Sequence, residues 1–504
     1  MRVEFTLLTV GLLLALSIIA TRTTNRFGVP ALLLFLIIGM LAGSDGPGGI
    51  AFEDYQLAQT VGVIALIFIL FSGGLDTYWS AIRPVFVEGL ILANGGVLLS
   101  SILLGVFTML VLGFDWQMGL LLGAIVSSTD AAAVFSVMRG QSVNLKHRLE
   151  PLIELESGSN DPIAVFLTLG LVGLITTPGA SLLALIPSFV LQMALGAVGG
   201  WLCGQVIVQA INRIRLQQEG LYVVFTLALT LLSYGAVALV GGNGFLAVYL
   251  AGMVVGNRNL VHKRSILRFH DGIAWLMQIT MFLTLGLLVF PSQLVSVAPM
   301  GLLVALGLIL IARPLSVAAV LIWFRRSLPE IVMVSWAGLR GAVPIVLATF
   351  PLLAGLPDAM LIFNIIFFVV LVSVLLQGMS ITWVARRLGL NAEPKQEPEA
   401  QLYVPDVRLS SRMLEATIPA DSSLVGQALI DAGVPRGVLV VHIQRGDTPL
   451  IPGGSTLLDA HDHLLLLATP EATPALEVWR RQANLCMVPA PGSPSRPEEG
   501  MPVA

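Results

Sequence analysis

The stretch ESGSNDP, residues Glu156–Pro162, lies near the middle of an otherwise apolar segment of this chain. It gathers two carboxylates, two hydroxyls and an amide at a depth where the core of a bilayer tolerates few polar groups. Charged side chains at that depth usually mark an ion or substrate pathway. Asp130 and Arg340 lie at a comparable depth in two other apolar segments. We therefore expect three segments to bring their polar groups together at one site inside a membrane.

The composition is that of a polytopic membrane protein. Of 504 residues, 56% are hydrophobic and 11% are charged, against about 25% charged in an average soluble domain. The net charge of −3 is small and does not favour binding to nucleic acid. The two cysteines, Cys203 and Cys486, have neither a disulfide framework nor metal-ligand spacing. We therefore expect no redox or zinc chemistry, no enzymatic activity and no cofactor.

Apolar runs long enough to cross a bilayer predict thirteen membrane segments. We break the runs at glycine, proline and charged clusters. The approximate extents are 4–21, 28–43, 58–75, 85–112, 117–138, 150–176, 181–211, 219–240, 243–257, 270–290, 296–324, 329–352 and 359–385.

Basic residues set the expected orientation, because they favour the cytoplasmic side of short loops. Alternate connections hold sixteen lysines and arginines, whereas the intervening loops, such as 43–53 and 355–358, hold none. This asymmetry predicts an external N-terminus and a cytoplasmic C-terminus, which requires an odd number of spans. A cleaved signal peptide is the alternative for residues 1–20, but no clear small-residue cleavage site follows, so we favour a retained helix.

Two of these segments are predicted to be broken near mid-membrane. Residues 127–130 place four polar side chains in a row within segment 117–138, and these compete for backbone hydrogen bonds. In segment 329–352, Gly338, Gly341 and Pro344 flank Arg340, and proline removes a backbone donor. Broken helices at corresponding positions are typical of transporters with inverted repeats. We therefore predict an all-α membrane domain with inverted repeats and crossed discontinuous helices.

A carboxylate at such a site can hold a monovalent cation or a proton, and competition for it couples the two fluxes. Asp161 lies about eleven residues, or roughly 16 Å, into its helix, near the middle of a core about 30 Å thick. We interpret Asp161 as the group that exchanges the two ions. The hydroxyls of Thr129 and Ser157, with carbonyls freed at the broken helix, are the expected cation ligands, since hard cations prefer oxygen.

The other polar groups have supporting roles in this hypothesis. We expect Glu156 to form an ion pair with Arg340, because an unpaired charge at that depth is costly. Asp130 would neutralise helix N-termini, which favour anions. Asn160 has no titratable proton and would position its neighbours. With one freely titrating acid, the expected exchange is electroneutral.

Several other charged groups are given structural interpretations. Arg313, next to Pro314, is interpreted either as a second internal charge or as a brace for a kinked helix. Asp76 and Glu88 are expected at the membrane interface. Five histidines are expected to be solvated, in loops or in the soluble part of the chain: His262, His270, His442, His461 and His463.

These motifs together resemble one family. Glu156-Ser157, two small residues, then Asn160-Asp161, with Thr129-Asp130 and Leu339-Arg340-Gly341, are similar to the electroneutral, NhaP-type branch of the bacterial monovalent cation/proton antiporters. The similarity covers about residues 5–390. It implies a thirteen-helix homodimer of the inner membrane, in which a core domain moves against a dimerisation domain.

The third segment departs from that family. Many members carry an acid before the paired glycines of this helix, whereas this chain has Ser72 before Gly73 and Gly74, with Asp76 a turn later. This difference concerns the coordination shell and therefore the cation selectivity.

After Leu390 the composition changes, which predicts four domains or linkers: an exchanger domain (1–390), a linker (391–404), a small α+β domain (405–486) and a disordered tail (487–504). In the α+β domain we expect strands at 413–418, 437–443 and 464–468, and helices at 424–432 and 475–481. Arg445, the run Pro452–Gly454 and Asp462 resemble the regulatory RCK-C (TrkA-C) domain of potassium channels and transporters, which implies a small-molecule ligand.

Four functions are compared on these grounds. Exchange of K⁺ for H⁺ is favoured, because the C-terminal domain resembles one found on potassium transporters, and Na⁺/H⁺ exchange is the alternative. An ion channel is disfavoured because the chain has no filter-like Thr-Val-Gly-Tyr-Gly segment. An intramembrane aspartyl protease would use Asp130 and Asp161, but neither lies in a Tyr-Asp or Gly-x-Gly-Asp motif.

Overall fold

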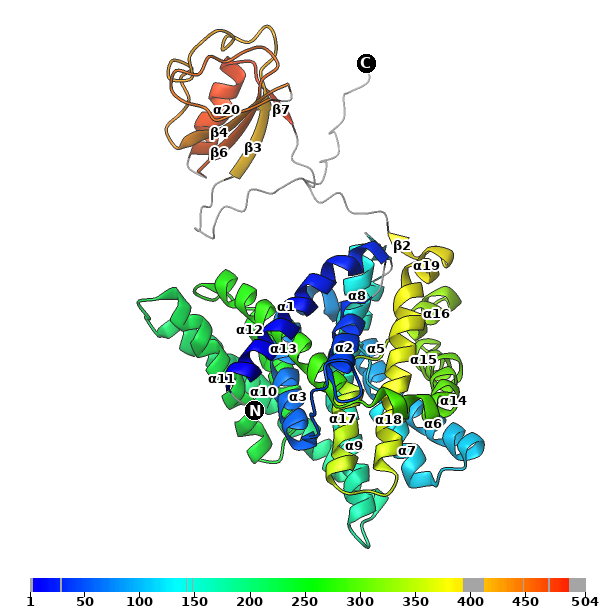
Figure 1. Ribbon diagram of the computed structural model, residues 1–504. Coiled ribbons are helices and arrows are strands. Elements are labelled where there is room, and N and C mark those ends of the chain that lie inside the picture. The colour runs from blue at the N-terminus through cyan, green and yellow to red at the C-terminus, as the bar shows by residue number, and fades with distance from the viewer. Residues whose placement is uncertain are drawn as a thin grey trace. The chain divides into compact units, whose positions relative to one another are not determined.

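The computed structural model describes residues 3–27, 30–141, 143–146, 148–392, 412–446, 448–469 and 472–488. The chain forms two compact units, residues 1–395 and 396–504 (Figure 1). We call them the membrane unit and the soluble unit and describe each by itself. Most of the predicted linker, 393–404, and most of the predicted tail, 489–504, lie outside the described residues.

The membrane unit is helical, and its described helices group into the thirteen predicted segments. In chain order they are α1 (Val3–Phe27); α2 (Ala31–Ala42); α3 (Tyr55–Asp76); α4, α5 and α6 (Trp79–Ile82, Phe86–Ile91 and Val97–Leu112); α7 and α8 (Trp116–Ile125 and Ala131–Gly140); α9 (Leu149–Thr176); α10 (Leu185–Arg213); α11 (Glu219–Leu239); α12 (Gly244–Gly256); α13 (Lys263–Leu287); α14 and α15 (Pro291–Gly307 and Arg313–Leu321); α16 and α17 (Leu328–Trp336 and Val343–Leu353); α18 and α19 (Ala359–Ser373 and Met379–Arg387).

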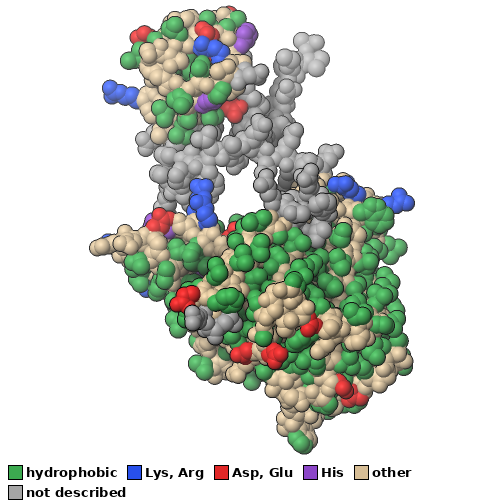
Figure 2. Space-filling model, viewed as in Figure 1, with side chains coloured by type: hydrophobic (Ala, Val, Ile, Leu, Met, Phe, Trp, Pro, Cys, Tyr) green, Lys and Arg blue, Asp and Glu red, His purple; other side chains and the backbone are tan. Residues whose placement is uncertain are grey.

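Length and composition qualify most of these helices, although not α13 and α16, as candidate membrane spans. Eight described helices are long and apolar enough to cross a bilayer alone, and five shorter apolar helices include both halves of the fifth segment. Large apolar side chains remain exposed on the outer helices, such as Leu110 at 81% and Leu239 at 89%. Figure 2 shows this hydrophobic surface with few charges on it. A lipid environment explains such a surface, because a soluble protein rarely exposes so large an apolar area.

Short polar side chains fix where several helices begin. The carboxylate of Asp115 accepts a hydrogen bond from the Met118 amide at 3.1 Å at the start of α7. Asn243 accepts one from the Leu246 amide at 3.0 Å at the start of α12. These caps satisfy backbone donors that have no partner within the helix.

The fifth and twelfth segments are both broken, as predicted. The fifth is interrupted between α7 and α8, and the twelfth between α16 and α17. The two breaks contact each other, because the Asp130 amide donates to the Leu339 carbonyl at 2.8 Å. Gly341 allows this approach, since a β-carbon there would collide with the Asp130 carboxylate. Unwound backbone at membrane depth is tolerated because it is buried in protein or lines a cavity.

The soluble unit is an antiparallel sheet with one helix. Its strand order is β5-β4-β6-β3-β7, and Trp479 of the helix donates to the Ala432 carbonyl at 2.7 Å. The elements are β3 (Arg412–Thr417), β4 (Val438–Arg445), β5 (Thr448–Leu450), β6 (His463–Ala468), α20 (Thr473–Gln482) and β7 (Cys486–Val488). In the membrane unit, β1 (Asn144–Leu145) pairs with β2 (Asn391–Ala392), at the start of the predicted linker.

The helix predicted at 424–432 is wrong, because this stretch forms turns. Gly426 has a φ of 80°, which a helix does not accommodate. The amides of Leu429 and Ile430 donate to the carbonyls of Thr456 and Gly454, each at 2.9 Å. The stretch therefore forms separate turns, and several of its amides bond to a neighbouring loop instead of continuing a helix.

Candidate ion-binding site

Asp161 lies on α9 opposite the break between α7 and α8. Its side chain is largely buried, with 8% of the residue exposed. The hydroxyl of Ser128, which belongs to the broken backbone, donates to the Asp161 carboxylate. The helix and the break are thus joined at the acid predicted to exchange ions.

Thr129, Asn160 and Ser157 form a second set of contacts at the same break. The Asn160 amide donates to the Thr129 hydroxyl at 2.6 Å. The Ser157 hydroxyl donates to the Thr129 carbonyl at 2.8 Å and accepts from the Ala131 amide at 2.9 Å. The two bonds of Ser157 satisfy backbone groups that the interruption leaves without a helical partner. The structure therefore brings together the predicted residues of α9 and of the break.

Asp130 lies at the N-terminal end of α8, and the Arg340 side chain lies at the C-terminal end of α7. Asp130 is the N-cap of α8 and accepts from the Ala133 amide at 3.0 Å. The Arg340 guanidinium donates to the carbonyls of Ser127 and Ser128 at 2.6 and 2.8 Å, just beyond the C-terminal end of α7. Anions favour helix N-termini and cations favour C-termini. Each charge therefore stabilises the helix end beside it.

The predicted ion pair between Glu156 and Arg340 is corrected by the structure. Glu156 pairs with Arg313, whose two terminal nitrogens lie 2.5 and 2.8 Å from its carboxylate oxygens. Both side chains are at least 98% buried. The reason is that Arg340 is already held by backbone carbonyls, whereas Arg313 needs a carboxylate to offset its charge at this depth. Of the two interpretations of Arg313, a second internal charge is the one observed.

A cavity of about 440 Å³ connects the predicted site to one end of the membrane unit. Ser128, Thr129, Asp130, Ser157 and Asp161 all line it. The same cavity is lined by seven polar residues that the sequence did not single out as site residues: Asp76, Thr77, Tyr78, Arg139, Glu154, Tyr249 and Gln278.

Glu154 is the most informative of these additional residues. It lies on α9 two turns before Asp161, about 10 Å along the helix axis. Its carboxylate accepts a hydrogen bond from Thr77 at 3.3 Å, and Thr77 also lies 3.4 Å from the Tyr249 hydroxyl. The seven-residue spacing to Asp161 was a signal available in the sequence, because residues seven apart share a helix face.

One other expectation is corrected. His270 is not solvated: it is fully buried on α13, with its ring centroid 4.9 Å from that of Phe71. The helix begins at Lys263, before the start of the apolar run at residue 270, so His270 lies inside it. Glu88, which is expected at the membrane interface, is buried and lies 2.7 Å from Arg326.

Comparisons with known proteins agree with this geometry. Residues 12–387 match the family described as "Sodium/hydrogen exchanger, transmembrane". The chain belongs to this family. Residues 413–479 of this exchanger match the TrkA-C domain, which confirms the resemblance of the soluble unit.

Individual relatives extend the comparison. The exchanger is 42% identical over 482 residues to the K(+)/H(+) antiporter NhaP2 of Shewanella sp. (strain ANA-3), covering 94% of this chain and 83% of that protein. It is 41% identical to the K(+)/H(+) antiporter NhaP of Alkalimonas amylolytica, covering 92% and 81%. The solved sodium proton antiporter MjNhaP1 of Methanocaldococcus jannaschii superposes with a TM-score of 0.64 at 26% identity, over 75% of this chain and all of that one.

Proposed function

We propose that this exchanger is a secondary antiporter that moves cytoplasmic K⁺ out in return for H⁺, electroneutrally, across a bacterial inner membrane. The observation that carries the proposal is Asp161, a carboxylate with no ion-pair partner among the described residues, at the crossing of two broken helices and open to a cavity. The proteins named as K⁺/H⁺ antiporters are 40–42% identical to it, and a Na⁺/H⁺ antiporter of M. jannaschii is 29% identical. That contrast supports K⁺, with Na⁺ as the alternative.

The site works by competition at one carboxylate. Asp161 holds either a proton or a monovalent cation, so that release of one is tied to binding of the other. Thr129, with backbone carbonyls of the break, supplies neutral oxygens that replace water around the cation. Ser157 and Asn160 hold the unwound backbone in place through the bonds described above. Asp130 and Arg340 stabilise the half-helix ends.

The cavity supports an inward-facing arrangement. It reaches Arg139 at the C-terminal end of α8 and Glu154 in the first half of α9. The connection between these helices is one of the basic loops, which favour the cytoplasm. In this topology the N-terminus is external, the soluble unit is cytoplasmic, and Asp161 is open to cytoplasmic cations.

Two further proposals concern assembly and regulation. We infer that the exchanger is a homodimer, as its family resemblance implies, with its described α1 surface largely exposed in one chain. We also infer that the soluble unit (from about residue 405 to 486) regulates transport through a small-molecule ligand.

The test uses everted vesicles from antiporter-deficient cells, in which a pH gradient is built and K⁺ or Na⁺ is then added between pH 7 and 9. Dissipation of the gradient by K⁺ but not Na⁺ in wild-type vesicles, and by neither in Asp161→Asn vesicles, is the expected result. A response to Na⁺ alone would replace the K⁺ assignment, and no response to either cation would overturn the antiport function.

A further inference from the structure

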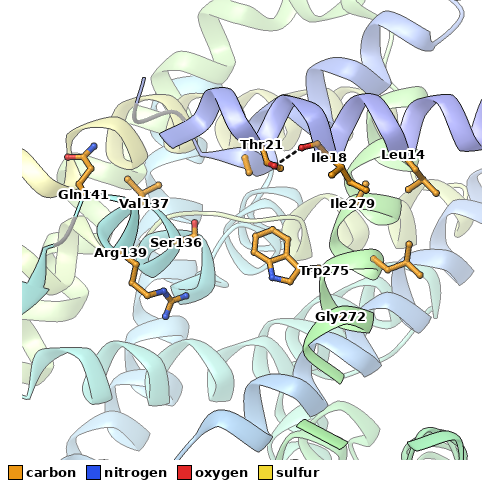
Figure 3. Close-up of a pocket in the computed structure, with 13 residues that line it drawn as sticks. Leu14, Ile18, Thr21, Ser136, Val137, Arg139, Gln141, Gly272, Trp275 and Ile279 are labelled. Carbon is orange, nitrogen blue, oxygen red and sulfur yellow. Dashed lines mark hydrogen bonds between the residues drawn. The ribbon is translucent and has the colours of Figure 1, made fainter. Parts of the chain in front are cut away.

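A second cavity, of about 620 Å³, lies between α1, α8 and α13, away from Asp161. Figure 3 shows its lining, with Trp275 of α13 between the other labelled side chains. The wall is mostly apolar, and one face is built by α1, of whose membrane window only 6% is buried. The cavity therefore lies beside the exposed apolar surface of α1.

The lining changes from polar at one end of the cavity to apolar at the other. Arg139 and Gln141 lie together at one end in Figure 3, and Leu14 and Ile279 lie at the other. The chain directions agree with this order. Arg139 and Gln141 are at the C-terminal end of α8, and Leu14 precedes the end of α1 by about three turns. The cavity thus matches a molecule with a polar head and an apolar tail.

Arg139 supplies a charge for the polar end. Its guanidinium makes no ion pair with any residue that the structure describes, in contrast to Arg313 and Arg326, which are each paired. Nitrogens of a guanidinium bind phosphate oxygens in a bidentate, charge-assisted way. A zwitterionic headgroup carries the same phosphate but adds a quaternary ammonium, which the positive charge of Arg139 repels, so a headgroup with a net negative charge complements this end better.

We propose that the cavity binds an anionic phospholipid, with its phosphate at Arg139 and an acyl chain between α1 and α13. Arg139 also lines the ion cavity. A bound phosphate offsets its positive charge at the mouth of that cavity and favours the approach of cations. The binding site stands by itself; only this effect on transport rests on the proposed antiport.

The binding test is thermal unfolding of the purified full-length protein in detergent, titrated with phosphatidylglycerol, phosphatidylcholine or glycerol 3-phosphate. A ligand that binds the folded state raises Tm. We expect a larger rise with phosphatidylglycerol than with the other two. An equal rise with phosphatidylcholine, or with glycerol 3-phosphate alone, would overturn an anionic-lipid site.

Two glycines provide a matched pair of variants. Gly272 lines the cavity, and a β-carbon at Gly272 or at Gly235 of α11 would meet no atom within 4 Å. Gly272→Leu fills the cavity and should abolish the phosphatidylglycerol-specific rise, whereas Gly235→Leu should retain it. Arg139→Gln, which leaves the cavity empty, should reduce the rise to that of phosphatidylcholine. Retention of the full rise in both Gly272→Leu and Arg139→Gln would overturn the proposal.

The transport test is separate. In proteoliposomes, replacing phosphatidylcholine by phosphatidylglycerol should lower the apparent KM for the cation in wild type, and the change should be lost in Gly272→Leu. Lipid-specific binding without this change in KM would remove the effect on transport and leave the binding site. A change in oligomeric state on Gly272→Leu, with no lipid-specific rise in wild type, would assign the cavity to a second copy of the chain and overturn the lipid site.

Discussion

The acids within the membrane unit fall into two groups, according to whether an arginine forms an ion pair with the carboxylate. Glu156 is paired with Arg313, and Glu88 with Arg326. The acids that line the ion cavity, among them Asp161 and Glu154, have no lysine or arginine nitrogen within 4 Å among the described residues. A paired carboxylate has its charge offset permanently. An unpaired one must find a proton or a cation, which is the property that antiport needs.

A paired acid and an unpaired acid lie close together on α9. The ion pair of Glu156 and Arg313 brings α9 against α15, and Glu156 itself is only five residues from Asp161. Successive turns of one helix thus hold an acid paired with an arginine and the acid that we propose to exchange ions. Both acids are buried, so burial does not distinguish them. The presence of an arginine partner does.

The largest effect is expected at Asp161. Asp161→Asn removes the titrating group and keeps its shape and a hydrogen-bond acceptor for Ser128. Exchange should fall to background, while the yield and Tm of the purified protein stay at or above wild type. Asp161 is in no ion pair among the described residues, so its replacement leaves no partner charge uncompensated. Vesicle pH-gradient dissipation and thermal unfolding measure the two quantities. Glu53→Gln, at an exposed acid outside the cavity, is the control. Exchange at wild-type rates in Asp161→Asn would remove the basis of the comparison.

The opposite pattern is expected at Glu156. Glu156→Gln leaves Arg313 buried and uncompensated, which for a buried pair typically costs about 3–5 kcal/mol of folding free energy. Tm and yield should fall strongly, and the remaining folded protein should still exchange. The double variant Glu156→Gln with Arg313→Gln should recover part of the Tm, because it removes both charges together. If the single and double variants were equally unstable, the two charges would not act as a pair.

Sequence reasoning found the broken helices because local signals, four polar residues in a row and clustered glycine and proline, are visible in one segment at a time. The choice of Asp161 and Thr129 as ion-binding residues rests on the same kind of local signal and stays a prediction. It chose the wrong partner for Glu156, since pairing depends on how helices distant in sequence pack. Arg313 and Arg340 are both mid-segment arginines, and only the structure shows that Arg340 is occupied by the carbonyls of Ser127 and Ser128.

The soluble unit gives a parallel example. Its strands were predicted from short apolar runs, which are local. The stretch 424–432 was assigned to a helix because its apolar spacing suits one, but its amides bond to residues 454–458. A tertiary contact overrode the local preference, which single-sequence reasoning does not detect.

A smaller effect is expected at Glu154, which attracts cations without binding them at the exchange site. Its charge lies about 10 Å from that of Asp161. At that distance one charge is worth about 1 kcal/mol, or about fivefold in KM. Glu154→Gln should therefore raise the apparent KM for the cation with little change in maximal rate, and Glu154→Asp should restore it. Concentration series of K⁺ in the vesicle assay separate KM from rate. A fall in the maximal rate at unchanged KM would mean that Glu154 has a structural role, as the paired acids do.

The smallest effect is expected at an acid of the soluble unit, Asp462, which is also paired with an arginine. Arg445 lies 2.8 Å from Asp462 and 2.6 Å from Asp459. Burial opposes ionisation of Asp462, but the hydrogen bonds from Arg445 and the Asp459 amide outweigh it and hold the pKa of this carboxyl below its usual range. A lowered folded-state pKa stabilises the fold above the unfolded pKa of about 3.9, and this stabilisation is lost as pH falls through the folded value.

Arg445→Gln should therefore lower the Tm of the soluble unit modestly at pH 7, because the arginine is partly exposed and its ion pairs are screened by solvent. The difference from wild type should begin to shrink below about pH 4, the unfolded-state pKa, and should disappear only below the lowered folded-state pKa of Asp462, where this carboxyl is protonated in both proteins. Thermal unfolding of the full chain across this pH range, followed by a signal from the sheet, measures it. A difference in Tm that is independent of pH would mean that Arg445 stabilises the unit through its bond to the Leu457 carbonyl and not through its charge. The charge of this paired acid would then not stabilise the soluble unit. The comparison between paired and unpaired acids would then hold only for the membrane unit.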